Sequence, residues 1–265
     1  MIIGIRGTLA TCSFELLRSL TAQRIAVIGV LALFPASMLA LITWLPRAQG
    51  INVQIAFMEG LIILLVGLVG LLALLLWAST NVYTELEGKS WVFIACRPSG
   101  RVSMVLGKYL AAFVLSFSIC WIAMTLATIV AQTTGSLNNP NRFWLAMSGL
   151  LAIACAVYAA VFTLIGVVFY RRAMVFCAGY ILAIEMVVAN VPAMVSKFTV
   201  RFHLQELLID WLGWIPPLRE DGYRLIFGDC AQWVNWVTFA AIVVLCLAGS
   251  CYVIVNREYL TADET

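Results

Sequence analysis

The sequence predicts an all-α, polytopic membrane protein, and three observations support this fold class. Of the 265 residues, 63% are hydrophobic and 11% are charged, and the mean hydropathy is +1.02. Water cannot solvate a globule of this composition. Six apolar runs are long enough to cross a bilayer, and most of the charges lie between them. We therefore expect a single transmembrane domain over residues 1–265.

Each of the six runs is expected to form one membrane-spanning helix. They cover approximately residues 25–45, 55–78, 104–131, 143–169, 173–195 and 233–255. About 20 helical residues cross about 30 Å of hydrocarbon. The runs must be helical because lipid offers no partners for backbone N–H and C=O groups. The connection at Arg171 and Arg172 is so short that the fourth and fifth helices should form an antiparallel hairpin.

Positive charges are distributed unequally between the two sides of this topology. Ten Lys and Arg residues fall on the side of the termini and six on the other side. Since cytoplasmic loops carry the excess of Lys and Arg, both termini are predicted to be cytoplasmic, in a multi-pass protein of the cell's inner (plasma) membrane. The net charge of +3 follows from this topology, and we expect no nucleic-acid partner.

The first 23 residues precede the first apolar run. Apolar residues recur there at roughly helical spacing, with Glu15 and Arg18 among them and Arg24 directly after them. This pattern predicts an amphipathic helix on the inner membrane surface, although a plain cytoplasmic extension of the first span also fits. Arg6, Glu15 and Arg18 interrupt any apolar core of signal-peptide length, so we expect no cleavage.

Two polar segments separate the apolar runs. Residues 81–103, on the predicted cytoplasmic side, could attach soluble machinery. Residues 196–232, on the other side, mix acids, bases and aromatic residues. Apolar residues in this second segment allow a short interfacial helix, namely Phe202, Leu204, Leu207, Leu208 and Trp211. Anchoring in the membrane interface without any transport role is an equally good interpretation.

The motifs of nucleotide-binding and metal sites are largely missing. Gly88-Lys89-Ser90 resembles the end of a phosphate-binding loop, but Tyr83 stands where that motif requires glycine. His203 is the single histidine, which excludes the H-E-x-x-H motif and an all-histidine metal site. The eight cysteines include no C-x-x-C pair. We expect no enzymatic activity of the chain itself, no cofactor and no metal.

The cytoplasmic segment and the start of the third run contain a distinctive order of residues. The motif E-x-E-G-K comes first, then R-P, then a single arginine, and finally L-G-K-Y. The residues of this order are Glu85, Glu87, Gly88, Lys89, Arg97, Pro98, Arg101, Leu106, Gly107, Lys108 and Tyr109. This order resembles the loop between the second and third helices of ABC exporter permeases of the type-two class. The six-helix count, the segment FELLRSL (Phe14 to Leu20) and the pattern Glu185, Pro192, His203, Leu204 are also similar to that family.

The resemblance implies a role for each segment. Residues 1–23 would be the elbow helix, residues 81–103 would dock a separate cytoplasmic ATPase, and re-entrant helices within 196–232 would cap the translocation path. The docking residues would be Glu85, Glu87, Gly88, Lys89, Trp91, Arg97 and Pro98. A short acidic and aromatic helix could enter a groove of the ATPase and end at the proline. The residues alone also permit a solvated turn whose acids balance nearby cations.

Two acids fall inside predicted spans. Glu185 lies 13 residues after Arg172, about 20 Å from the inner boundary. An ionisable group at that depth either lines a path or is hydrogen-bonded as a structural element. Glu59 lies about 6 Å inside the outer end of its helix, so it could reach water by snorkelling. With Pro192 and His203 from the family pattern, these acids are the candidate residues of a translocation path or gate.

The sequence thus leads to the expectation of an ABC exporter permease that binds a cytoplasmic ATPase subunit, membrane lipids and a second permease subunit. That second subunit could be an identical or a related chain. Two alternatives remain open. One is a secondary transporter or channel in which Glu185 carries protons or ions, and the other is a membrane anchor or assembly factor that transports nothing.

Overall fold

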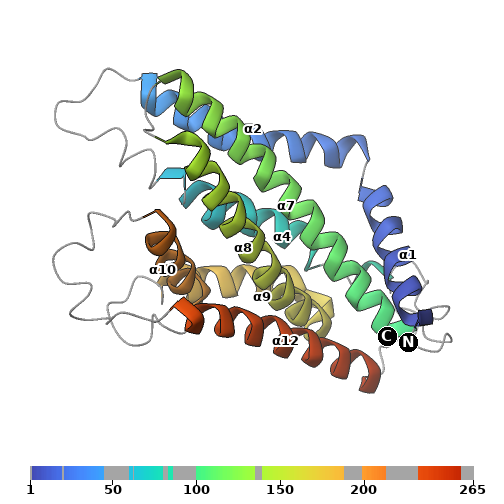
Figure 1. Ribbon diagram of the computed structural model, residues 1–265. Coiled ribbons are helices and arrows are strands. Elements are labelled where there is room, and N and C mark those ends of the chain that lie inside the picture. The colour runs from blue at the N-terminus through green and yellow to red at the C-terminus, as the bar shows by residue number, and fades with distance from the viewer. Residues whose placement is uncertain are drawn as a thin grey trace.

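The computed structural model describes residues 2–19, 21–44, 60–61, 63–79, 83–85, 100–134, 139–187, 199–212 and 232–257. Nearly all of these residues are helical, and none of them is in a β-strand, which confirms the all-α prediction. The elements are α1 (Ile2–Ser19), α2 (Ala22–Trp44), η1 (Ile63–Gly70), α4 (Leu71–Trp77), α7 (Gly100–Thr134), α8 (Pro140–Val168), η2 (Tyr170–Arg172), α9 (Ala173–Tyr180), η3 (Ile181–Val187), α10 (Val200–Leu212) and α12 (Gln232–Asn256). Figure 1 presents their arrangement.

Four of these helices are long and apolar enough to cross a membrane. The qualifying stretches are Ala22–Leu41, Gly100–Thr133, Pro140–Val168 and Gln232–Asn256, and they coincide with four of the six predicted runs. The second predicted span contains the shorter apolar helix Ile63–Trp77. The fifth contains α9 and η3, which end at Val187, and residues 188–195 lie outside the described residues. Six spans therefore stay a prediction.

Helix α7 is the central helix of the bundle and contacts α1, α2 and α8, while α12 packs on α8. Its 35 residues measure about 50 Å, which exceeds the roughly 30 Å of hydrocarbon. The helix begins at Gly100, so residues 100–103, expected in the cytoplasmic loop, are its first turn. The polar segment is correspondingly shorter, because the chain extends its helix beyond the apolar stretch.

The predicted tight turn between α8 and α9 is present. Helix η2 occupies Tyr170–Arg172, and the backbone N–H of Arg172 donates to the carbonyl of Phe169. Past this turn the chain runs back along α8, with the rings of Phe162 and Tyr180 in edge contact at 6.1 Å. The two helices therefore form an antiparallel hairpin, since their side chains meet at matching distances from the turn.

Helix α1 forms an angle with α2 and packs against the first turns of α7 (Figure 1). Gly107 makes this contact close: a Cβ atom there would lie 2.7 Å from the carbonyl oxygen of Thr8. On other parts of α1, Leu9, Phe14 and Leu17 are 58%, 61% and 72% exposed. A helix that leaves large apolar side chains uncovered fits a position in the membrane interface.

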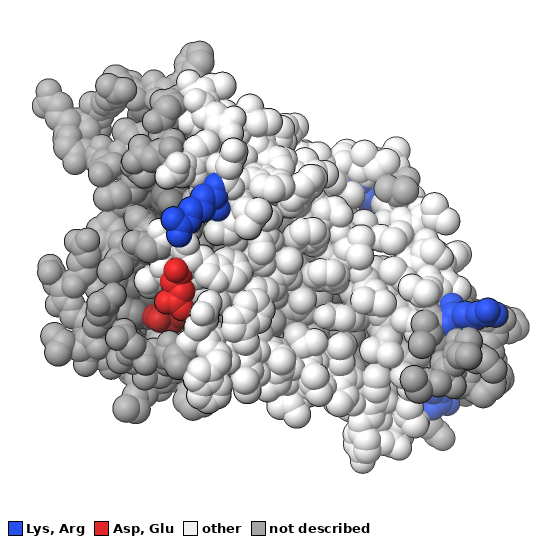
Figure 2. Space-filling view, in the orientation of Figure 1, with Lys and Arg blue, Asp and Glu red and all other residues white. Residues whose placement is uncertain are grey.

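Charged side chains lie toward the two ends of the molecule on the face drawn in Figure 2, and the broad middle is uncharged. At one end the start of α7 meets the ends of α8 and α12, because Arg101 Nη1 donates to the carbonyl of Val255 (3.0 Å) and Arg257 Nη1 to that of Val168. Helix α10 lies at the opposite end (Figure 1). This distribution of charge suits a protein whose middle is surrounded by hydrocarbon.

Candidate functional site

Four charged side chains meet where α1 crosses α7, and we call Glu15, Arg18, Glu85 and Lys108 the charged junction. Lys108 Nζ lies 2.6 Å from Glu85 Oε1 and 3.0 Å from Glu15 Oε1. Arg18 Nη1 lies 3.7 Å from Glu85 Oε1 and 3.9 Å from Glu15 Oε1. Two cations and two carboxylates balance, which is what permits the Lys108 side chain to be only 2% exposed.

The junction combines the segments on which the family resemblance is based. Glu15 and Arg18 belong to FELLRSL, Glu85 is the first acid of E-x-E, and Lys108 belongs to L-G-K-Y. Gly107 provides the close approach of α1 to α7. Tyr109 donates to the carbonyl oxygen of Ala156 on α8 at 3.3 Å. Three motifs that are separate in the sequence are therefore one packing unit in the structure.

Glu85 makes its contacts within the chain. Its side chain is 9% exposed and its carboxylate faces Lys108 and Arg18. This geometry ties the start of the predicted docking loop to α1 and α7, and it leaves little of Glu85 for a partner protein. The other predicted docking residues lie outside the described residues, namely Glu87, Gly88, Lys89, Trp91, Arg97 and Pro98. ATPase docking stays a prediction.

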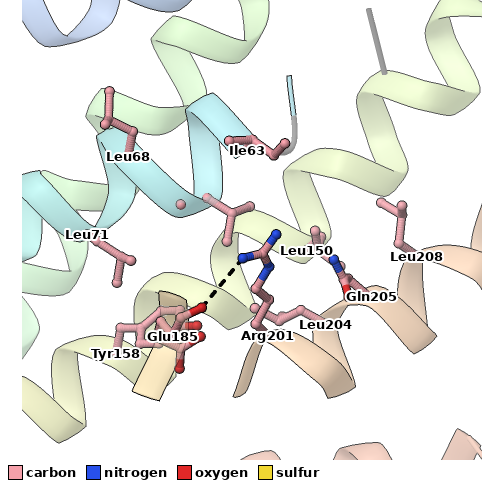
Figure 3. Close-up of a pocket in the computed structure, with 12 residues that line it drawn as sticks. Ile63, Leu68, Leu71, Leu150, Tyr158, Glu185, Arg201, Leu204, Gln205 and Leu208 are labelled. Atoms are coloured by element: carbon pink, nitrogen blue, oxygen red, sulfur yellow. Dashed lines mark hydrogen bonds between the residues drawn. The ribbon is translucent and has the colours of Figure 1, made fainter. Parts of the chain in front are cut away.

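A cavity of about 120 Å³ lies between α8, α10 and the π-helical parts of the second and fifth predicted spans. Its lining is mostly apolar, with Tyr158, Glu185, Arg201 and Gln205 as the polar exceptions (Figure 3). We call it the Glu185 pocket. Helix η1 and helix η3 both contribute to its wall. π-Helical turns are rare and frequently occur at functional sites.

Glu185 is the buried acid of this pocket, with 3% of its surface exposed. Tyr180 Oη donates to Glu185 Oε1 at 3.4 Å, and Arg201 Nη1 donates to the backbone carbonyl of Glu185 at 3.5 Å. Glu185 Oε2 is buried and accepts no hydrogen bond from the part of the chain that is described. Most buried polar atoms have a partner, so this oxygen requires an explanation.

His203 lies on another face of α10, away from the pocket lining. It is buried, and its Nδ1 lies 2.7 Å from Asn235 Oδ1 on α12. This bond joins α10 to α12, which gives His203 a definite packing role. Glu59 and Pro192, the other predicted path residues, lie outside the described residues.

The pocket contains two polar residues that sequence analysis did not select. Arg201 lies in the outer polar segment 196–232, and Tyr158 lies in the apolar run 143–169. A tyrosine in a membrane helix gives no sequence signal that it lines a pocket. An arginine within a partly apolar helix is a weak signal that its side chain faces the interior of the bundle. Within the described ranges, no group of three or more His, Cys, Asp or Glu residues could hold a metal ion.

No protein-family model matches this chain, and no curated protein matches it with significance.

Proposed function

We propose that this chain is the membrane subunit of an ATP-driven exporter of the type-two ABC class. The observation that carries the proposal is the charged junction. The elbow-like helix, the start of the docking loop and the third helix are joined there by ion pairs of 2.6 and 3.0 Å to one buried lysine. A connection of this kind would transmit a displacement of the loop to α1 and α7, as coupling to an external ATPase requires.

The proposed mechanism assigns no covalent chemistry to this chain. ATP binding would bring two separate ATPase subunits together, and they would displace the docking loops of two permease subunits. The permeases would be two identical chains or this chain and a related one. Their helical bundles would then change the side of the membrane to which a central path opens. The six spans and the cytoplasmic termini expected from the sequence belong to this proposal.

Crosslinking from the loop tests the proposal. We expect a photo-crosslinking amino acid at Trp91 to capture a soluble protein that is also labelled by a photoreactive ATP analogue. The same group at Tyr252, which is 71% exposed on α12, should capture no such protein and serves as the matched control. Equal capture from both positions, or capture of proteins that bind no nucleotide, would contradict the proposed coupling.

A secondary transporter or channel is the second candidate function, favoured by the buried Glu185 and by its Oε2, which has no hydrogen-bond partner among the described residues. In that case transport would follow an ion or proton gradient and would continue without ATP. Transport measured in vesicles that lack ATP but keep a proton gradient separates the two functions. A membrane anchor would transport nothing under either condition.

A further inference from the structure

We propose that the Glu185 pocket binds the headgroup of an aminophospholipid, with its primary ammonium on the Glu185 carboxylate and its phosphate on Arg201. As a statement about binding, this follows from the pocket itself. As a statement about the transported substrate, it rests on the proposed function.

The Glu185 carboxylate has one oxygen, Oε2, that receives no hydrogen bond from the described residues. Oε1 receives one long bond from Tyr180, the Tyr158 hydroxyl lies close to the same carboxyl group, and Oε2 itself is buried. An ionised carboxylate only accepts hydrogen bonds, and a primary ammonium has three N–H groups to donate. A ligand ammonium placed beside Oε2 would satisfy this oxygen and neutralise the carboxylate in a site that is largely shielded from water.

Arg201 supplies the complementary charge on the same cavity. Its guanidinium points into the pocket in Figure 3. Its bond to the Glu185 carbonyl is long, 3.5 Å, and a guanidinium has five N–H donors. Arginine binds phosphate oxygens with two parallel hydrogen bonds in favourable cases. One carboxylate beside one guanidinium suits a zwitterionic headgroup better than a purely anionic or a purely cationic one.

The remainder of the pocket suits a lipid rather than a water-soluble zwitterion. Apolar side chains from η1, α4 and α10 form most of the wall. Two lining residues, Ile63 and Leu68, are also exposed on the outside of the molecule, by 56% and 38%. The pocket therefore reaches an apolar outer surface, where acyl chains could lie while the headgroup enters between the helices.

Native mass spectrometry of the full chain, purified in detergent and freed of lipid, tests the inference. The probes are phosphatidylethanolamine, its mono- and dimethylated forms and phosphatidylcholine, all with the same acyl chains. We expect phosphatidylethanolamine to bind about tenfold more tightly than phosphatidylcholine, because the quaternary ammonium has no N–H donor for the carboxylate. Affinity should fall with each added methyl group. Equal affinity across this series, which requires no variant, would overturn the inference.

Variants locate the site. Glu185→Gln should abolish the preference among headgroups, whereas Arg201→Gln should weaken all of these phospholipids, since they share the phosphate. Asp210→Asn, an exposed acid on α10 outside the pocket lining, should bind like the wild type. A preference that persists in Glu185→Gln would place the ammonium elsewhere and refute the assignment.

Water-soluble phosphoethanolamine distinguishes the two sources of this headgroup. It should not displace the lipid at matched concentrations, because it lacks the acyl chains that the apolar wall would contact. Efficient displacement would contradict the lipid assignment. These measurements contain no ATPase and no ATP, so their failure would leave the proposed coupling intact, and failure of the crosslink from Trp91 would leave lipid binding intact.

Discussion

Replacing Lys108 by methionine should strongly destabilise the contact between α1 and α7. The ammonium lies 2.6 and 3.0 Å from two carboxylate oxygens, and its side chain is 2% exposed. Methionine keeps the length of the side chain but leaves Glu15 and Glu85 facing each other without the cation between them. Removing one partner of a buried ion pair costs about 3 to 5 kcal/mol. Arg18 offsets part of this loss, since it remains 3.7 Å from Glu85.

Thermal unfolding and amide hydrogen exchange measure this loss. At about 2 to 4 °C per kcal/mol, a loss of about 3 kcal/mol should lower Tm by about 6 to 12 °C. Exchange should accelerate first in α1, whose contact with α7 depends on the junction. Arg24→Met removes an exposed cation at the start of α2 and should change neither measurement appreciably.

A double variant separates the loss of charge balance from the loss of packing. Lys108→Met with Glu85→Gln leaves one carboxylate, Glu15, beside one cation, Arg18, and should recover a large part of the lost stability. A Lys108→Met protein with the Tm and α1 exchange of the wild type would refute this account of the junction. Failure of Glu85→Gln to restore any stability would assign the defect to packing alone.

Three further predictions concern other residues. Gly107→Ala should lower the free energy of unfolding by about 1 to 3 kcal/mol, because the new Cβ would lie 2.6 Å from Thr11 Cβ and 2.7 Å from the Thr8 carbonyl oxygen. Gly29→Ala is the control in a measurement of Tm, because a Cβ there would meet no atom within 4 Å. Equal Tm values for the two variants would contradict the close packing at Gly107. A membrane-impermeant thiol reagent should label Cys230 in intact cells and should reach Cys12 and Cys96 only after permeabilisation; labelling of Cys96 from outside would reverse the topology. Since burial raises the pKa of the Cys12 thiol, the labelling of Cys12 should accelerate as the pH rises through the alkaline range. The Glu185→Gln variant should fold with wild-type yield but have altered transport. The Glu185→Ala variant should lose about 1 to 3 kcal/mol of its free energy of unfolding, because the Tyr180 hydroxyl loses its acceptor. Wild-type transport by the Gln variant would remove Glu185 from the path.

Hydropathy was sufficient to locate most of the helices. The apolar cores of Ala22–Leu41, Gly100–Thr133, Pro140–Val168 and Gln232–Asn256 follow from their hydropathy, because an apolar segment in lipid must be helical. The turn at Arg171 and Arg172 followed from its shortness. The starting point of α7 did not follow, because Gly100, Arg101 and Ser103 interrupt the apolar pattern there. Contact with α1, for example of Gly7 with Ser103, accompanies the first turn of α7, and hydropathy does not measure such contacts.

The partners of the charged residues could not be read from the sequence. Lys108 was counted as one cytoplasmic cation among ten, yet it is buried between two acids that lie far from it in the sequence. Arg201 was assigned to an outer segment, yet it lines the same pocket as Glu185. The partners of both residues depend on which helices cross and on where along their lengths they cross. The π-helical geometry of η1 and η3 also could not be predicted from the sequence, because their Leu, Ile, Val and Gly residues occur in ordinary membrane helices as well.

ATP hydrolysis by the complex that purifies with this chain tests the proposed coupling most directly. The complex is isolated through a tag on this chain, and its hydrolysis rate is compared between the wild type and a Glu87→Ala, Trp91→Ala double variant. Asp210→Ala, at the end opposite the junction, is the control. We predict vanadate-sensitive hydrolysis with the wild type and the control, and its loss with the loop variant although that chain still inserts in the membrane. Hydrolysis that is absent from the wild-type complex, or unchanged in the loop variant, would contradict the account.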